Sequence, residues 1–209
     1  MKQATDEFEA AVELFAHSNS LKGEDKKSKE ILFQWRMIAG RIGALCLYDF
    51  WMATQGINKD LLPRCPTIRS LIDETPKNAA QAAFVNAFPT AAKLRYTAAH
   101  PAEVNATPEK AKANSVSGQG TIGGINVFDV GDDGSFNMQT GLINDQYATT
   151  FKGQLLSYAL NHTSTLALRS AQEGWFKAFD PASEELRRRD IEQHLRTVRQ
   201  QAEGQNRRQ

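Results

Sequence analysis

The chain has 209 residues, of which 41% are hydrophobic and 23% are charged, and its formal net charge at pH 7 is +1. This length is enough for one ample globular domain, or for one domain and a half, with a sizeable core. The small net charge excludes a global field that would draw the protein to nucleic acid or to an anionic membrane, so any such contact must come from a local patch.

We expect neither a secretory signal nor a membrane-spanning segment. Its first ten residues contain no apolar h-region. The most apolar stretch, residues 38–50, is interrupted by Arg41 and Asp49 and is too short to cross a bilayer. Two cysteines, Cys46 and Cys65, suit a reducing compartment, so we expect a cytoplasmic protein. Without a CxxC pair or a histidine cluster, we predict neither a metal site nor a cofactor.

The first elements predicted along the chain are helices. Apolar side chains at three- to four-residue spacing predict a helix over residues 5–17 and a long helix over residues 28–55, which Gly56 ends. The long helix has a stripe with the spacing of a bundle seam, formed by Ile31, Trp35, Ile38, Ile42, Leu45 and Met52. A second apolar line widens this face and contains Leu32, Ala39, Cys46, Phe50 and Ala53. Because the stripe is longer than a small bundle needs, we expect a homodimer that uses the bundle helices.

Prolines delimit the helices that follow. We predict helices over residues 68–74, 77–88 and 90–99, the last of which is stopped by His100-Pro101. Residues 102–124 are rich in Pro, Asn, Ser, Lys and Gly, which predicts a linker or a mobile loop. Beyond it the apolar period changes to two, which predicts an antiparallel meander of four short strands, at residues 125–130, 136–140, 146–151 and 154–160, with hairpin turns at 131–134 and 152–153.

Two helices are predicted after the strands. Asn161 caps a helix that runs to about Phe179, and Asp180-Pro181 opens the last helix, because proline is favoured at the first helical position. The last helix has a narrow apolar stripe, which contains Leu186, Ile191, Leu195 and Val198. So thin a stripe does not stabilise a helix alone. We expect it to pack on the protein's own body or on a dimer mate; the alternative is a separate partner or RNA.

Together these elements predict an α+β protein that is mainly α, in three parts. Residues 1–101 form a helical bundle, residues 102–124 a linker or mobile loop, and residues 125–209 a β-meander with two C-terminal helices. The last part either belongs to the same domain as the bundle or forms a separate one.

Two patterns fit ligand motifs without the structural context that those motifs need. The sequence GQGTIG at residues 118–123 matches a dinucleotide fingerprint, which requires a strand before it and a helix after it. A polar linker precedes it here and a strand follows, so we interpret it as a flexible loop. Asp129, Asp132 and Asp133 lack the twelve-residue ligand spacing of an EF-hand and are explained by a hairpin turn.

The last helix is also rich in arginine, at Arg187, Arg188, Arg189, Arg196 and Arg199. Acidic residues at helical spacing partly balance these charges, as in a solvated helix face. The sharper interpretation is a surface that contacts RNA.

The sequence RYTAAH contains Arg95 and His100 in an Arg-x4-His spacing at the end of the predicted bundle. On this motif and the helical context, residues 1 to about 110 resemble the HEPN superfamily of helical bundles, which are often homodimeric. The resemblance implies either a metal-independent endoribonuclease or an inactive relative. Arg95 and His100 would then be the catalytic pair, with Tyr96 orienting them or touching a base. A histidine and an arginine suit this chemistry, which needs proton transfer and a cation beside the phosphorane.

A structural role explains the same residues. Five residues along an ideal helix turn by about 140°, so Arg95 and His100 share a site only if His100 lies beyond the helix end. Otherwise Arg95 is a surface charge and His100 caps the helix C-terminus. A second Arg-x4-His match, Arg189 to His194, lies in the charged last helix. The rival hypothesis is therefore a non-enzymatic protein-interaction or assembly protein, whose partner is another protein.

Overall fold

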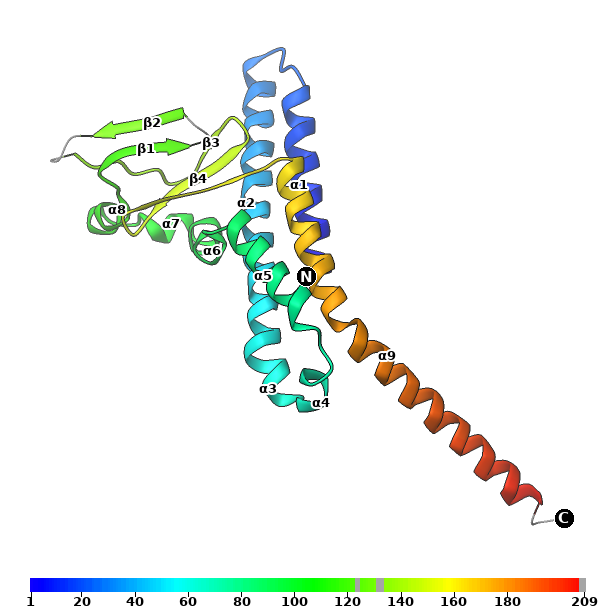
Figure 1. Cartoon of the computed structure of the whole chain (residues 1–209). Coiled ribbons are helices and arrows are strands. Elements are labelled where there is room, and N and C mark those ends of the chain that lie inside the picture. The colour runs from blue at the N-terminus through cyan, green and yellow to red at the C-terminus, as the bar shows by residue number, and fades with distance from the viewer. Residues whose placement is uncertain (123–124, 131–133, 207–209) are drawn as a thin grey trace.

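The computed structural model describes residues 1–122, 125–130 and 134–206; within these ranges the side chains of Pro101, Arg199 and residues 201–206 are not described. The longest helices build the body, and they are α1 (Lys2–Ser20), α2 (Lys26–Gly56), α5 (Glu74–Ala87) and α9 (His162–Asn206). Helices α1 and α2 form an antiparallel hairpin, and α9 runs along α5 and α1 (Figure 1). The predicted class, mainly α with small antiparallel sheets, is confirmed.

Side-chain caps fix where three of these helices begin. Asp25 accepts a hydrogen bond from the Ser28 backbone N–H at 2.7 Å at the start of α2, and Asp73 accepts one from Thr75 at 2.9 Å at the start of α5. Asn161 caps α9, as predicted, and accepts from the Ser164 N–H at 3.0 Å. Each cap satisfies one of the N–H groups that lack a partner in the first turn of a helix.

Helix α2 ends at Gly56, as predicted, but the chain does not leave the helical conformation there. Gly56 has ordinary helical angles, φ −59° and ψ −42°, and the chain continues through a π-helical turn η1 (Ile57–Leu61) and the short α3 (Leu62–Arg64). The predicted end of α2 is therefore right, but the helical path continues past it, and Ile57 in the π-helical turn packs against the core. The turn α4 (Pro66–Arg69) then leads toward α5.

The buried face of α2 is formed by the second apolar line, and of the predicted seam only Ile42 and Leu45 pack against the core. Leu32, Ala39, Cys46 and Phe50 are buried, whereas the seam residues Ile31, Trp35, Ile38 and Met52 are 39–47% exposed. Gly40 and Gly43 explain the choice of face. A Cβ atom at Gly40 would clash with the ring of Tyr147, and one at Gly43 would clash with the hydroxyl of Tyr158. The buried face is thus the one on which the β-region can approach the helix backbone.

The strands form two antiparallel sheets. β1 (Gly118–Ile122) pairs with β2 (Ile125–Val130), and a three-stranded meander has the order β3 (Gly141–Ile143), β4 (Gln146–Phe151), β5 (Gln154–Ala159). The predicted turn between β4 and β5 is confirmed, with positive φ at Lys152 (48°) and Gly153 (72°), as a type I′ hairpin requires. Of the strand predicted at 136–140, Phe136 alone forms an isolated bridge, to Val116. The other predicted turn falls mostly on residues 131–133, outside the described residues.

Residues 102–122 are more ordered than the predicted linker or loop. After α6 (Ala91–Ala99) the chain forms α7 (Pro101–Val104), α8 (Pro108–Asn114) and then β1. The buried Asn114 side chain holds this region together, since its amide donates to the Val104 carbonyl at 2.7 Å and its oxygen accepts from the Lys152 N–H at 3.1 Å. Polar composition predicted a loop, but long-range hydrogen bonds of this kind decide the local structure.

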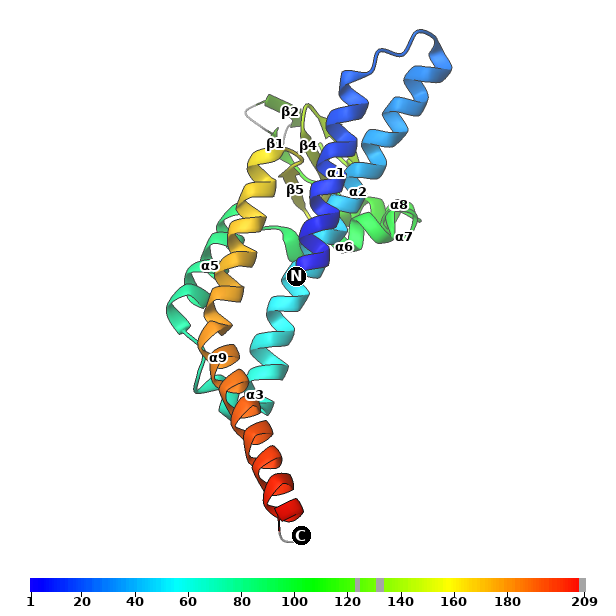
Figure 2. The same ribbon diagram turned by 90° about the vertical axis from the view of Figure 1, so that its right-hand side faces the viewer.

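Helix α9 is one continuous helix of 45 residues, where we predicted two helices that meet at Pro181. Pro181 removes the hydrogen bond that an N–H at this position would donate to the Lys177 carbonyl. In the same turn the Ala178 carbonyl accepts a hydrogen bond from the Asp73 N–H at 2.9 Å, which ties the helix to the start of α5. Ala182, the residue after Pro181, is buried. Past Ala182 the helix leaves the body and extends alone (Figures 1 and 2). We call residues 183–206 the projecting segment.

Candidate functional site

The predicted catalytic residues lie on α6 and at its C-terminal end. The Arg95 guanidinium is 4.7 Å from the ring centroid of Tyr48, which places Arg95 against α2. His100 follows the last residue of α6 with non-helical angles, φ −125° and ψ 48°, as the proline after it led us to expect. Its Nδ1 lies 3.3 Å from a carboxylate oxygen of Glu103 on α7. The two residues are thus engaged with different elements, and no described contact joins them.

Tyr96, by contrast, lines a cavity of about 440 Å³ between α6, α8 and the β4–β5 hairpin. Its ring centroid is 5.2 Å from that of Phe151 and 5.9 Å from that of His100. Arg95 and His100 are not among the residues that line this cavity. The structure therefore places one of the three predicted residues in a hollow and leaves the pair beside it on the surface.

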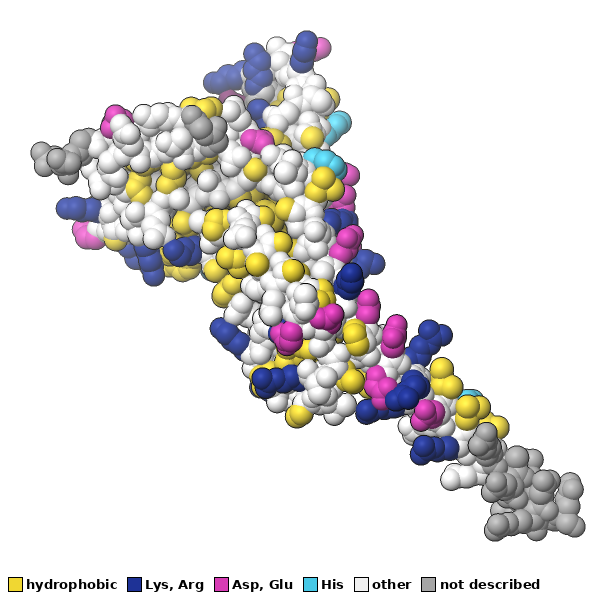
Figure 3. All heavy atoms as spheres, in the orientation of Figure 1, with side chains coloured by type: hydrophobic (Ala, Val, Ile, Leu, Met, Phe, Trp, Pro, Cys, Tyr) yellow, Lys and Arg dark blue, Asp and Glu magenta, His cyan; other side chains and the backbone are white. Residues whose placement is uncertain are grey.

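Lysines surround this aromatic cavity, which we call the Tyr96 pocket. Its charged lining residues are Lys93, Lys110 and Lys152, with Glu103 as the acidic one. The Lys152 ammonium lies 5.3 Å from the Phe151 ring centroid, and the Lys93 Nζ donates to Gln154 Oε1 at 2.5 Å. Figure 3 shows dark blue side chains gathered on this side of the β-region. The three lysines are at least 17 positions apart in the sequence, so no sequence motif indicated them.

The predicted RNA-contacting arginines all fall on the projecting segment. Arg187, Arg188, Arg189 and Arg196 are exposed, while the Arg199 side chain lies outside the described residues. Glu185 accepts from Arg188 at 2.6 Å and from Arg189 at 2.7 Å, and Glu192 lies 4.0 Å from Arg196. These pairs at i, i+3 and i, i+4 support the helix by a few tenths of a kcal/mol each, roughly 0.2–0.5 kcal/mol.

The apolar residues of the projecting segment do not form a single stripe. On an ideal helix Ile191, Leu195 and Val198 lie within about 60° of one another, whereas Leu186 is roughly 120–180° away from them. These four side chains are 47–51% exposed. We call Ile191, Leu195 and Val198 the tail stripe. It has no cover in the described residues, and Figure 3 shows yellow side chains along this part of the helix.

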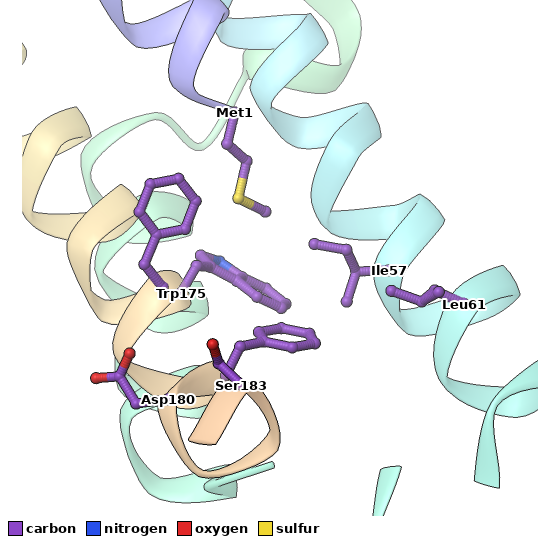
Figure 4. Close-up of a pocket in the computed structure, with 8 residues that line it drawn as sticks. Met1, Ile57, Leu61, Trp175, Asp180 and Ser183 are labelled. Atoms are coloured by element: carbon purple, nitrogen blue, oxygen red, sulfur yellow. The ribbon is translucent and has the colours of Figure 1, made fainter. Parts of the chain in front are cut away.

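A second hollow lies where α9 leaves the body. It has a volume of about 380 Å³ and is bounded by η1, the N-terminus and α9. In Figure 4 Met1 and Ile57 point toward the indole of Trp175 across it, and Asp180 and Ser183 lie at its edge. The Trp175 Nε1 is buried and has no hydrogen-bond partner within the described residues. We call this hollow the α9 groove.

Buried groups elsewhere have shifted pKa values but line neither hollow. Burial raises the pKa of the Cys46 thiol to about 12, with a further contribution from Glu7, and burial raises that of Tyr147 to about 12. Tyr158 also has a strongly raised pKa because it is buried. These shifts keep the three groups neutral, so they belong to the core and not to a reactive site.

The remaining candidate motifs have structural explanations. Residues 118–122 of the GQGTIG sequence form β1 and not the expected flexible loop, and Gly123 lies outside the described residues. Asp129 accepts a hydrogen bond from the Gln119 side chain at 3.0 Å, and Asp132 and Asp133 lie outside the described residues. Within the described ranges no three His, Cys, Asp or Glu side chains gather as metal ligands. Among the described helices, none is both long and apolar enough to span a membrane.

Comparison with known proteins adds no relative: no family model, no curated protein and no solved structure matches the chain. The HEPN-like resemblance and the ribonuclease activity that it implies therefore stay predictions.

Proposed function

We propose that this chain is a non-enzymatic interaction and assembly protein that docks a partner through the projecting segment of α9. The observation that carries the proposal is the exposure of the tail stripe on a helix that has left the body. Most helices in proteins gain their stability from an apolar face that is packed, and the tail stripe is exposed in the single chain. Exposed apolar surface on such an element is typical of an interaction site.

The geometry around Arg95 and His100 supports the same proposal. A metal-independent nuclease needs a base, an acid and a cation around one phosphate, each within hydrogen-bond reach. Here Arg95 contacts Tyr48 while His100 contacts Glu103, so a single chain does not offer that arrangement.

Photo-crosslinking in the cells that naturally produce the protein tests the proposal, because the partner is present there. A photo-reactive amino acid at Leu195, in the tail stripe, should give discrete adducts, because this side chain would lie against the partner. The matched control is Gln193, which is exposed on the other side of the same helix turn and should give far less product. Equal and diffuse labelling at both positions would refute docking through the tail stripe.

A second function, binding of single-stranded RNA, is favoured by the Tyr96 pocket. An aromatic floor between lysines is the arrangement that single-strand binding proteins use to stack bases and to contact phosphates. Stacking on one aromatic side chain contributes about 1–3 kcal/mol. Tyr96→Ala should therefore weaken binding of a labelled oligouridine by about 5- to 150-fold, whereas Tyr96→Phe, which keeps the ring, should not. Equal affinities for the two variants would exclude stacking at this position.

A further inference from the structure

Helix α9 has opposite charge on the two sides of Leu186. The thirteen residues before it, 173–185, contain four carboxylates and one lysine, which gives a net charge of −3. The thirteen residues after it, 187–199, contain five arginines and two carboxylates, which gives +3 with His194 neutral. The two halves are therefore equal in length and opposite in charge about one residue.

The same helix also carries two separate apolar surfaces. The acidic half borders the α9 groove, where Phe176 is 50% exposed and Leu61 of η1 is 39% exposed. The basic half carries the tail stripe. Beneath the groove lies the indole of Trp175, whose buried Nε1 has no hydrogen-bond partner within the described residues.

From this symmetry we infer that the partner of the projecting segment is a second copy of this chain, with the two α9 helices crossing antiparallel about a two-fold axis near Leu186. The inference rests on the proposed function and names its partner. The basic tail of each copy lies along the acidic half of the other, and its tail stripe covers the other copy's α9 groove. The contact extends over residues 173–199, which is about 40 Å at 1.5 Å per residue.

The charges select the second copy and the antiparallel direction. In a parallel pair, like halves would face each other, −3 against −3 and +3 against +3, which is repulsive. In an antiparallel pair the same surface is complementary to itself, which is the condition for a two-fold interface.

Two charge-reversal variants of the full chain test the inference by light scattering after size exclusion. Variant one is Asp180→Lys, Glu184→Lys and Glu185→Lys, which makes both halves of α9 basic. Variant two is Arg187→Glu, Arg188→Glu and Arg189→Glu, which makes both halves acidic. The wild type should have twice the mass of the chain at micromolar concentration, and each variant alone should have the mass of one chain. Mixed in equal amounts, the variants should recover the doubled mass, because each then offers the charge that the other lacks.

The mixing experiment separates charge pairing between chains from damage within a chain. Both variants lose the ion pairs of Glu185 with Arg188 and Arg189, and mixing does not restore those. The matched control is Trp35→Ser, on the exposed stripe of α2, which should leave the doubled mass unchanged.

Three results would overturn the inference: a monomeric wild type, variants that do not recover the doubled mass on mixing, or dissociation by Trp35→Ser. A monomer that still gives a discrete adduct with another protein at Leu195 in cells would leave the proposed function standing and refute only the second copy as partner.

Discussion

The orientation of α2 can be tested with two of its glycines, because Gly40 lies against the buried β-region and Gly56 has open space around it. At Gly40 an added Cβ would meet the ring of Tyr147, whose side chain is fully buried and has no room to move. At Gly56, the last residue of the same helix, an added Cβ meets nothing within 4 Å. Gly40→Ala and Gly56→Ala are therefore the same chemical change in two environments.

The expected effects have opposite signs. Alanine is favoured over glycine in a helix by about 0.8–1 kcal/mol, and Gly56→Ala should gain most of this. At Gly40 the same gain is offset by overpacking, which costs about 1–3 kcal/mol, and more when backbone must move. For a chain of this size 1 kcal/mol corresponds to roughly 2–4 °C in Tm. We expect Gly56→Ala to raise the Tm by a few degrees and Gly40→Ala to lower it by a similar or larger amount.

Thermal melts followed by circular dichroism measure both variants, and chemical denaturation gives the free energies. A double variant with Tyr147→Leu adds a further check. The loss from the two changes together should be smaller than the sum of the separate losses, because without the ring the clash is gone. If both glycine variants were stabilised equally, the Gly40 face would be open. The exposed stripe of Ile31, Trp35 and Ile38 would then be the core face that its spacing suggests.

Other consequences can be checked independently. If the nuclease prediction is correct, the purified protein cleaves single-stranded RNA in EDTA and His100→Ala abolishes cleavage without changing the Tm; uncleaved RNA across a broad substrate panel would count against it. The free energy of unfolding should fall as the pH rises above 9. The Cys46 thiol and the Tyr147 phenol have pKa values near 9.0 and 10.0 in the unfolded chain but about 12 in the fold, so the unfolded chain loses these protons first. A Tm that is constant up to about pH 11 would show that these groups are not buried. Asn114→Ala should destabilise the protein by about 1–3 kcal/mol, because it leaves the Val104 carbonyl and the Lys152 N–H without a partner. A smaller loss of stability in calorimetry would show that these two hydrogen bonds do not hold the region together.

The local elements of this protein follow closely from its sequence. Helical spacing predicted the helices of the body, Asn161 predicted the start of α9, and Lys152-Gly153 predicted the hairpin between β4 and β5. These features depend on side chains and backbone angles within a few residues, so the information for them is contained in a short window. The same rules failed where distant contacts act, as near Pro181, where the Ala178 carbonyl of the continuous helix accepts a hydrogen bond from Asp73, more than a hundred residues earlier in the chain.

Only the tertiary structure decided which apolar surface is buried and which side chains meet. Periodicity cannot rank two apolar lines on one helix; the aromatic rings of Tyr147 and Tyr158, from strands far along the chain, fit only against Gly40 and Gly43. The lysines of the Tyr96 pocket come from α6, α8 and the β4–β5 hairpin, so no spacing in the sequence indicates that they lie together. The change of charge at Leu186 can be read from the sequence. It indicates an interface only because α9 is one helix that leaves the body. Opposite charges on two separate helices would not define a common axis.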